Sequence, residues 1–94
     1  MTKRRASRIN KELILLKRVI NKIGFKKDLY YSESVYEYHY MRGYSHITIK
    51  TGNGTVESLN YYNSQKSRLY NKEEFYDLYK KVLRDIKLKE LYDI

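Results

Sequence analysis

The spacing of apolar positions predicts an amphipathic helix over residues 8–24. At 100° per residue, the apolar side chains of this segment gather on one helical face. The members of that face are Ile9, Leu13, Leu16, Ile20 and Ile23, flanked by Leu15 and Val19. Ser7 or Asn10 can cap the first turn, and Gly24 is a natural stop because glycine tolerates a left-handed backbone. We therefore expect the helix to bury one face and expose the other.

Further along the chain the apolar period changes to two, which is typical of β-strands. The predicted strands cover residues 35–40, 45–50 and 55–62, with turns at 42–43 and 52–54. A two-residue loop at 42–43 places Tyr38 opposite Ile47 and Tyr36 opposite Ile49. All four side chains then point to one face, so we expect an antiparallel meander with these residues on its core side.

The last third of the chain predicts a loop, a second helix and an apolar tail. Residues 63–70 are polar, and Asn71 with Glu74 three residues later has the spacing of a capping box. The apolar face of the helix that follows ends at Ile86, where the helical spacing slips. The apolar residues beyond the slip are Leu88, Leu91, Tyr92 and Ile94. This tail is a candidate contact with another protein or a second copy, unless it folds back on the core.

Together these elements predict an α+β fold in the order α-β-β-β-α. In it, two helices pack on one face of a three-stranded antiparallel sheet. We expect residues 1–7 to be a flexible basic arm and residues 8–94 to be a single domain, because 94 residues suit one domain. A hydrophobic fraction of 41%, with four Gly and no Pro, argues against a disordered or fibrous chain. We find no 18-residue apolar run and no secretory signal, and expect no membrane span.

The predicted element order resembles that of double-stranded-RNA-binding domains. That family also places basic residues at the start of its second helix, and Lys66 and Arg68 lie near the corresponding place here. The Gly-rich, Lys-Lys-containing approach to that helix and its Ala-rich sequence are absent from this chain. The resemblance therefore concerns the order of elements alone.

The formal net charge of +9 is concentrated near the N-terminus. Residues 1–27 carry ten Lys and Arg against one acid, Glu12, whereas residues 28–94 carry ten basic and ten acidic side chains. Clustered cations attract phosphates, and their binding releases the counterions condensed on a nucleic acid. The alternative interpretation of this segment is a solvated basic helix without a partner. The predicted nucleic-acid contacts are Lys3, Arg4, Arg5, Arg8, Lys11, Arg18, Lys22, Lys26 and Lys27, with Lys66 and Arg68 as secondary contacts.

The sequence offers no catalytic motif, and we expect no enzyme activity, cofactor or metal. Cys is absent, which excludes disulfides, thiol chemistry and Cys-based zinc sites. His39 and His46 face each other across the predicted hairpin, near Glu37, but a zinc site needs further ligands. An ordinary solvent-facing histidine pair is therefore expected. The glycines at 52–54 lack the Lys-Ser/Thr of a phosphate-binding loop.

Lys, Tyr, Ile and Asn make up 39 of the 94 residues, and their A/T-rich codons indicate a low-GC genome such as that of a virus or mobile element. We predict a small basic, non-catalytic cytoplasmic protein, a monomer or homodimer, in the host cell if viral. It is expected to bind nucleic acid or a nucleoprotein through the N-terminal helix. The alternative is an inhibitor of a host protein or defence complex, anti-CRISPR-like, that contacts an acidic protein surface. A membrane surface is disfavoured because the helix lacks Trp and Phe among its apolar residues up to Ile23.

Overall fold

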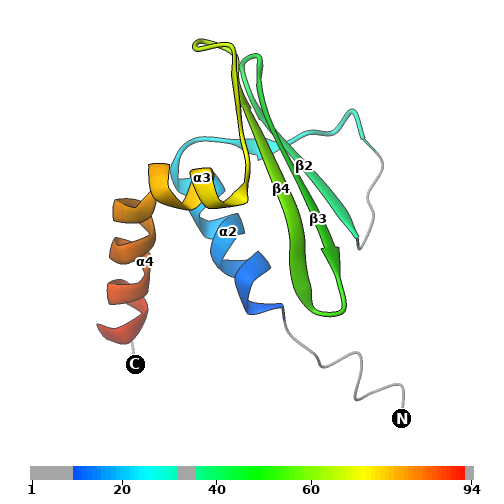
Figure 1. Ribbon diagram of the computed structural model, residues 1–94. Helices are drawn as coiled ribbons and strands as arrows, with labels where there is room; N and C mark the ends of the chain where they lie inside the picture. Colours follow the sequence, from blue (N-terminus) through cyan, green and yellow to red (C-terminus); the bar gives the residue numbers. More distant parts are fainter. Residues whose placement is uncertain (1–9, 32–35, 93–94) are drawn as a thin grey trace.

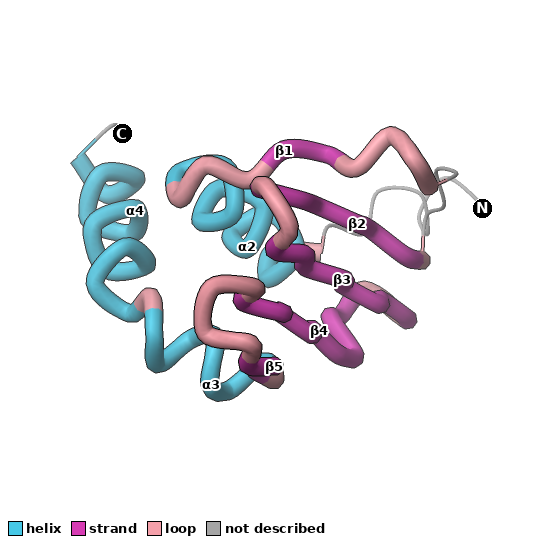
Figure 2. Tube along the Cα trace, turned by 90° about the horizontal axis from the view of Figure 1, so that it is seen from above, coloured by secondary structure: helices cyan, strands magenta, loops and turns pink. Residues whose placement is uncertain are grey.

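The computed structural model describes residues 10–31 and 36–92, with side chains described up to residue 89. Its elements are α2 (Lys11–Lys22), β1 (Lys26–Lys27), β2 (Glu37–Arg42), β3 (Ser45–Gly52), β4 (Thr55–Asn63), β5 (Arg68–Tyr70), α3 (Lys72–Leu78) and α4 (Lys80–Tyr92). The strands form one antiparallel sheet in sequence order, with β1 and β5 at its edges (Figure 1). The described helices lie on one side of this sheet (Figure 2).

The prediction of a three-stranded sheet with two helices is wrong, because the described residues form five strands and three helices. The two strands that we missed are β1 and β5, which contain two and three residues. Neither has an alternating apolar pattern long enough to indicate a strand, and each exists through pairing with its neighbour. The order α-β-β-β-α, on which the resemblance to double-stranded-RNA-binding domains rested, is therefore not the order of this fold.

Helix α2 follows its sequence signals closely. The Asn10 side chain accepts a hydrogen bond from the Leu13 N–H at 2.9 Å, which confirms one of the two predicted caps. The other, Ser7, lies outside the described residues. Beyond the helix, Gly24 has a φ of +94°, as expected for a glycine stop. The side chains of α2 that are buried beneath the sheet are Leu13, Leu16, Val19 and Ile20.

The first hairpin is displaced by two residues from the predicted register. Its loop is Gly43-Tyr44, and Arg42 pairs with Ser45. Gly43 has a φ of +61° at the first loop position, which a type II′ turn requires and which glycine adopts without strain. The glycine therefore determines where the chain reverses, and the prediction of a loop at 42–43 is wrong.

A displacement by two residues leaves each side chain on its predicted face of the sheet. Tyr38 pairs with Ile49 and Tyr40 with Ile47, and both tyrosines pack against the core. Tyr36 lies before the first residue of β2 and is 64% exposed. Its predicted place in the core is therefore wrong.

The second hairpin reverses within the predicted turn at 52–54. Its loop residues Asn53 and Gly54 have φ values of 51° and 78°, as in a type I′ turn. A register shift between Lys50 and Thr51 then marks a β-bulge. Val56 and Leu59 are three residues apart and are both buried on the helix side, which a regular period of two does not allow. The extra residue of the bulge allows both side chains to point to the same face of the sheet.

Aromatic side chains occupy the centre of the core. Tyr61 of β4 is fully buried, and its ring contacts Phe25 and Phe75 edge to face at centroid distances of 5.7 and 5.8 Å. It also stacks on Tyr70 at 5.3 Å. Buried Tyr hydroxyls need partners, and that of Tyr61 accepts from the Asn63 side chain at 3.0 Å. These contacts join the segment after α2 to α3 through the sheet.

The C-terminal segment forms two helices where one was predicted. Asn71 and Glu74 make both hydrogen bonds of the capping box, which confirms the predicted helix start. Helix α3 ends at Leu78 with Tyr79 as its C-cap, and α4 continues well past Ile86, where the predicted apolar face stops. Leu83 and Ile86 bury α4 against the core, whereas Leu88 remains exposed. With Leu83 and Ile86 packed against the core, Leu88 lies outside the apolar face of α4 and points to solvent.

Candidate nucleic-acid interface

Helix α2 presents a basic face away from the sheet. We call it the α2 basic face and define it by Lys11, Arg18 and Lys22, all of which are exposed. These residues lie opposite the buried side chains because their positions on the helix differ by about half a turn. The predicted contacts Lys3, Arg4, Arg5 and Arg8 lie outside the described residues.

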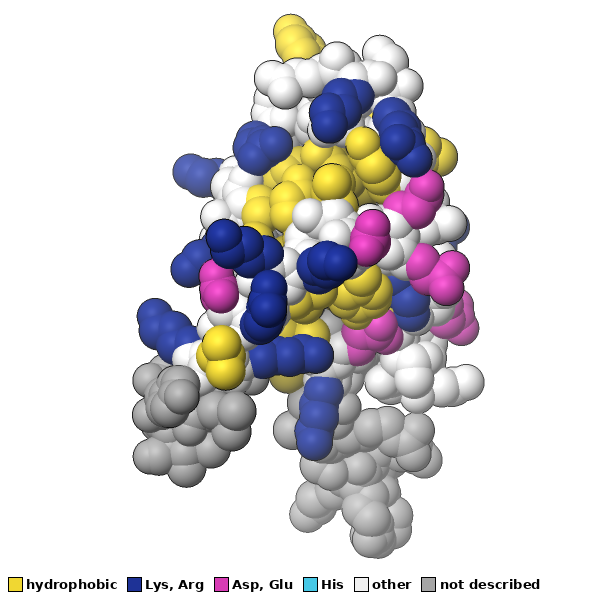
Figure 3. All heavy atoms as spheres, turned by 60° about the vertical axis from the view of Figure 1, so that its left-hand side comes forward, with side chains coloured by type: hydrophobic (Ala, Val, Ile, Leu, Met, Phe, Trp, Pro, Cys, Tyr) yellow, Lys and Arg dark blue, Asp and Glu magenta, His cyan; other side chains and the backbone are white. Residues whose placement is uncertain are grey.

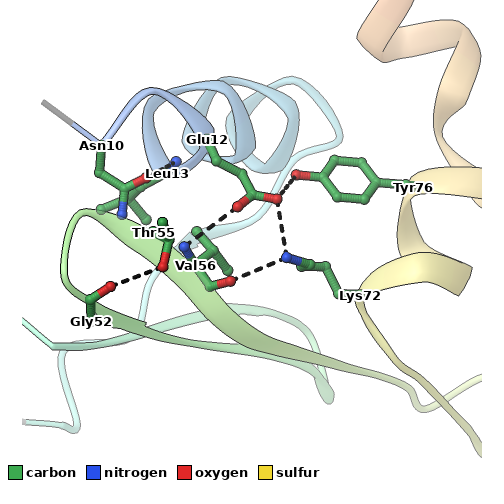
Figure 4. Close-up of polar contacts among 8 residues, drawn as sticks. All are labelled: Asn10, Glu12, Leu13, Gly52, Thr55, Val56, Lys72 and Tyr76. Atoms are coloured by element: carbon green, nitrogen blue, oxygen red, sulfur yellow. Dashed lines mark hydrogen bonds and ion pairs between the residues drawn. The ribbon is translucent and has the colours of Figure 1, made fainter.

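The single acid of α2 is turned toward the rest of the domain (Figure 4). Glu12 accepts a hydrogen bond from the Tyr76 hydroxyl at 2.6 Å and forms an ion pair with Lys72 at 3.2 Å. Its other oxygen accepts from the Val56 N–H at 3.4 Å. Burial acts to raise the pKa of Glu12, but the contacts with Tyr76 and Lys72 hold it below its ordinary value. Glu12 is therefore paired with Lys72 on the inner side of α2, away from the α2 basic face.

The remaining predicted cations lie at opposite edges of the sheet. Lys26 and Lys27 form β1 at one edge, whereas Arg68 begins β5 at the other. Arg68 forms an ion pair with Glu74 at 3.2 Å and lies over the Tyr70 ring at 4.6 Å. Lys66 is exposed in the turn before β5. The structure therefore does not bring all predicted cations to one surface, and Arg68 is engaged by an acid.

Helix α4 carries a second basic surface that the sequence reasoning missed. Its five exposed cations are Lys80, Lys81, Arg84, Lys87 and Lys89. Against two acids they give α4 a charge of +3, whereas α3 carries one Lys and three acids, a charge of −2. The negative charge of α3 and the positive charge of α4 lie within residues 28–94, whose net charge is zero, so the total does not reveal either one. Figure 3 shows cations over much of this side of the molecule, with most of the visible acidic side chains toward one border.

A helical spacing of cations was the signal that could have revealed this surface. Lys80, Arg84 and Lys87 are spaced i, i+4 and i+7, so they share one face of α4. Helices α2 and α4 lie side by side (Figures 1 and 2), and each carries its own set of exposed cations. Exposed positive charge is thus not confined to the N-terminal segment that the sequence indicated.

The two histidines lie on the sheet face opposite the helices, although they are not direct cross-strand partners. His46 pairs with Met41, and His39 pairs with Thr48. The two imidazole rings stack at 5.5 Å, and the Tyr31 ring stacks on His39 at 3.9 Å.

Each histidine has its own carboxylate. His39 contacts Glu37 at 2.8 Å, and His46 contacts Asp28 at 3.2 Å. A hydrogen bond with His39 lowers the pKa of Glu37. Within residues 10–31 and 36–92, no group of three or more His, Cys, Asp or Glu side chains is arranged to hold a metal ion. This arrangement fits two separate polar pairs better than a shared site.

The predicted apolar tail is described only in part. Leu88 is 45% exposed on α4, as a contact residue requires. The side chains of Leu91 and Tyr92, and all of Ile94, lie outside the described parts of the structure.

Comparisons with known proteins do not assign a family to this chain. No family model, no curated protein and no solved structure matches it. Among the described helices, none is both long enough and apolar enough to cross a membrane. The function must therefore be argued from the charges and contacts of the surface itself.

Proposed function

We propose that this protein binds nucleic acid, alone or within a nucleoprotein, through the α2 basic face and without catalysing a reaction. The observation that supports this proposal is the separation of charge on α2. Lys11, Arg18 and Lys22 point outward, while Glu12 is paired with Lys72 on the inner side. A polyanion that approaches α2 from outside therefore meets cations.

The length of the α2 basic face suits a phosphate backbone. Lys11 and Lys22 are eleven residues apart, which is about 16 Å along a helix that rises ~1.5 Å per residue. One nucleic-acid strand carries a phosphate every ~3.4 Å, so this face spans roughly five phosphates. Three phosphate contacts release enough counterions to contribute about −2.7 to the log–log slope of affinity against salt on duplex DNA.

Fluorescence anisotropy with labelled single-stranded DNA, duplex DNA and duplex RNA tests the proposal. The full chain is titrated at two salt concentrations. We expect micromolar or tighter binding that weakens steeply with salt. The triple variant Lys11→Glu, Arg18→Glu and Lys22→Glu should lose binding and keep its circular dichroism spectrum, since all three side chains are exposed.

A matched control separates a local interface from bulk charge. The triple variant Lys80→Glu, Arg84→Glu and Lys87→Glu changes the net charge by the same amount on α4. We expect it to retain most of the affinity. Equal losses in the two variants would show that total charge, and not the α2 basic face, controls binding. No binding of the wild-type chain at low salt would refute the proposed function.

A further inference from the structure

A shallow groove lies alongside α4. It has a volume of about 390 Å³ and is lined by Tyr76, Lys80, Leu83, Arg84, Lys87 and Leu88. We call it the α4 groove. Five of its lining residues belong to α4, and Tyr76 reaches it from α3. None of the six belongs to α2, so this groove and the α2 basic face are different surfaces.

The α4 groove combines apolar and positively charged side chains. Leu83, Leu88 and the ring of Tyr76 supply the apolar part, because the Tyr76 hydroxyl is turned to Glu12 at 2.6 Å. Lys80, Arg84 and Lys87 supply three cations, and no described lining residue is acidic. Lys80 forms an ion pair with Asp77 at 3.9 Å, and both side chains are highly exposed. That pair is screened by water and leaves the groove positive.

We propose that the α4 groove is a docking site for an amphipathic helix of a partner protein, one that carries apolar side chains flanked by Asp or Glu. This inference does not depend on the proposed binding of nucleic acid. The argument rests on complementarity. Leu88 is nearly half exposed, and an apolar side chain of a partner would remove it from water. Carboxylates beside that apolar side chain would meet Lys80, Arg84 and Lys87.

The spacing of the cations favours a helical occupant. Lys80 and Lys87 are seven residues apart, or about 10.5 Å along α4. A partner helix packed alongside α4 repeats its own side chains at the same intervals, so acids spaced i, i+4 and i+7 face the three cations together. A phosphate backbone also pairs with cations, but it offers no apolar group to cover the exposed part of Leu88. The mixed chemistry therefore favours the acidic amphipathic helix.

A designed peptide is the direct probe. The peptide is a fluorescein-labelled amphipathic helix with Leu at i, i+3, i+4 and i+7 and Glu on both sides of that stripe. The control is a scrambled peptide of the same composition. The full-length chain is titrated into each by fluorescence anisotropy, and amide chemical-shift changes locate the contact. We expect the designed peptide to bind at least fivefold more tightly than the scrambled one, with the largest shifts in α4.

Three variants assign the binding to the α4 groove. Leu88→Ser and Arg84→Gln should each weaken peptide binding at least threefold, because they remove the apolar and the charged part of the groove. Lys81→Gln removes a neighbouring exposed cation that does not line the groove, and it should leave affinity unchanged. All three positions are exposed, and thermal unfolding checks that each variant folds.

Other outcomes overturn this inference. Equal binding of the scrambled peptide, or an unchanged affinity in Leu88→Ser, would mean that charge alone attracts the peptide. Absence of peptide binding, or shifts of α4 groove residues with an oligonucleotide and not with the peptide, would also refute it. Substituting Lys11, Arg18 and Lys22 should not alter peptide binding, so failure here is distinguishable from failure of the proposed function.

Discussion

The hydroxyl of Tyr76 gives a sharp test of how α2 is attached to the rest of the domain. Tyr76→Phe keeps the ring and removes the 2.6 Å hydrogen bond to Glu12. A hydrogen bond to a charged group contributes about 1.5–3 kcal/mol. The Glu12 side chain is 32% exposed and keeps Lys72 as a partner, so water and Lys72 offset part of the loss. We therefore expect a decrease of about 1–1.5 kcal/mol in the free energy of unfolding at pH 7.

Urea denaturation followed by far-ultraviolet circular dichroism measures this loss, with Tyr44→Phe as the control. Tyr44 is 92% exposed, so removing its hydroxyl should have no measurable effect. In a domain of this size, a loss of 1 kcal/mol lowers Tm by about 4–8 °C. Equal stability of Tyr76→Phe and the wild-type chain at pH 7 would show that the hydroxyl does not hold Glu12.

The pH dependence separates the hydrogen bond from simple ring packing. The pKa of Glu12 in the folded chain lies below its ordinary value of 4.5. The ionised carboxylate therefore contributes stability above about pH 4.5, and this contribution is lost as the pH falls through the lowered pKa. The difference between wild type and Tyr76→Phe should shrink accordingly in acid. An undiminished difference at pH 3 would assign the effect to packing and refute the charge-based argument.

Two further predictions concern the core. Leu16 is fully buried, so Leu16→Ala should lower the free energy of unfolding by about 2–5 kcal/mol. Ile14 lies on the exposed side of α2, so Ile14→Ala should lower it by about 0.5 kcal/mol or less. Similar losses for the two variants in urea denaturation would contradict the observed orientation of α2. Burial and a hydrogen bond to Tyr61 raise the pKa of Tyr79 well above its ordinary value of 10.0, so absorbance at 295 nm should show a late phase of tyrosine ionisation in the folded chain. A single transition near pH 10 in the folded chain would contradict this second prediction.

Local signals were sufficient where the sequence determines its own backbone. Asn10, the capping box at Asn71 and the Asn53-Gly54 turn all act over two to four residues, and the structure confirms each one. Strands β1 and β5 depend instead on pairing with residues far along the chain, so their own sequences carried little information. The predicted register of the first hairpin was wrong because Gly43, with its positive φ, occupies the first loop position and not the second.

Of the two candidate surfaces, the sequence predicted the α2 basic face and missed the α4 groove. The α2 basic face follows from the helical period, because the cations lie opposite a continuous apolar face. The opposing charges of α3 and α4 cancel in the sequence total, and only the break at Tyr79 separates them in space. The α4 groove also needs Tyr76 from the preceding helix, a contact that no periodicity within α4 indicates.

The way the sheet ends has a consequence for crowded molecules. Proteins bound along a polyanion reach high local concentrations, where an exposed strand can pair with the sheet of the next copy and begin a fibre. Here one outer strand is only Lys26 and Lys27, and the other is three residues long and begins with Arg68. Short, positively charged edges offer few backbone groups and repel their own kind. Pairing of neighbouring copies through β1 or β5 is therefore disfavoured.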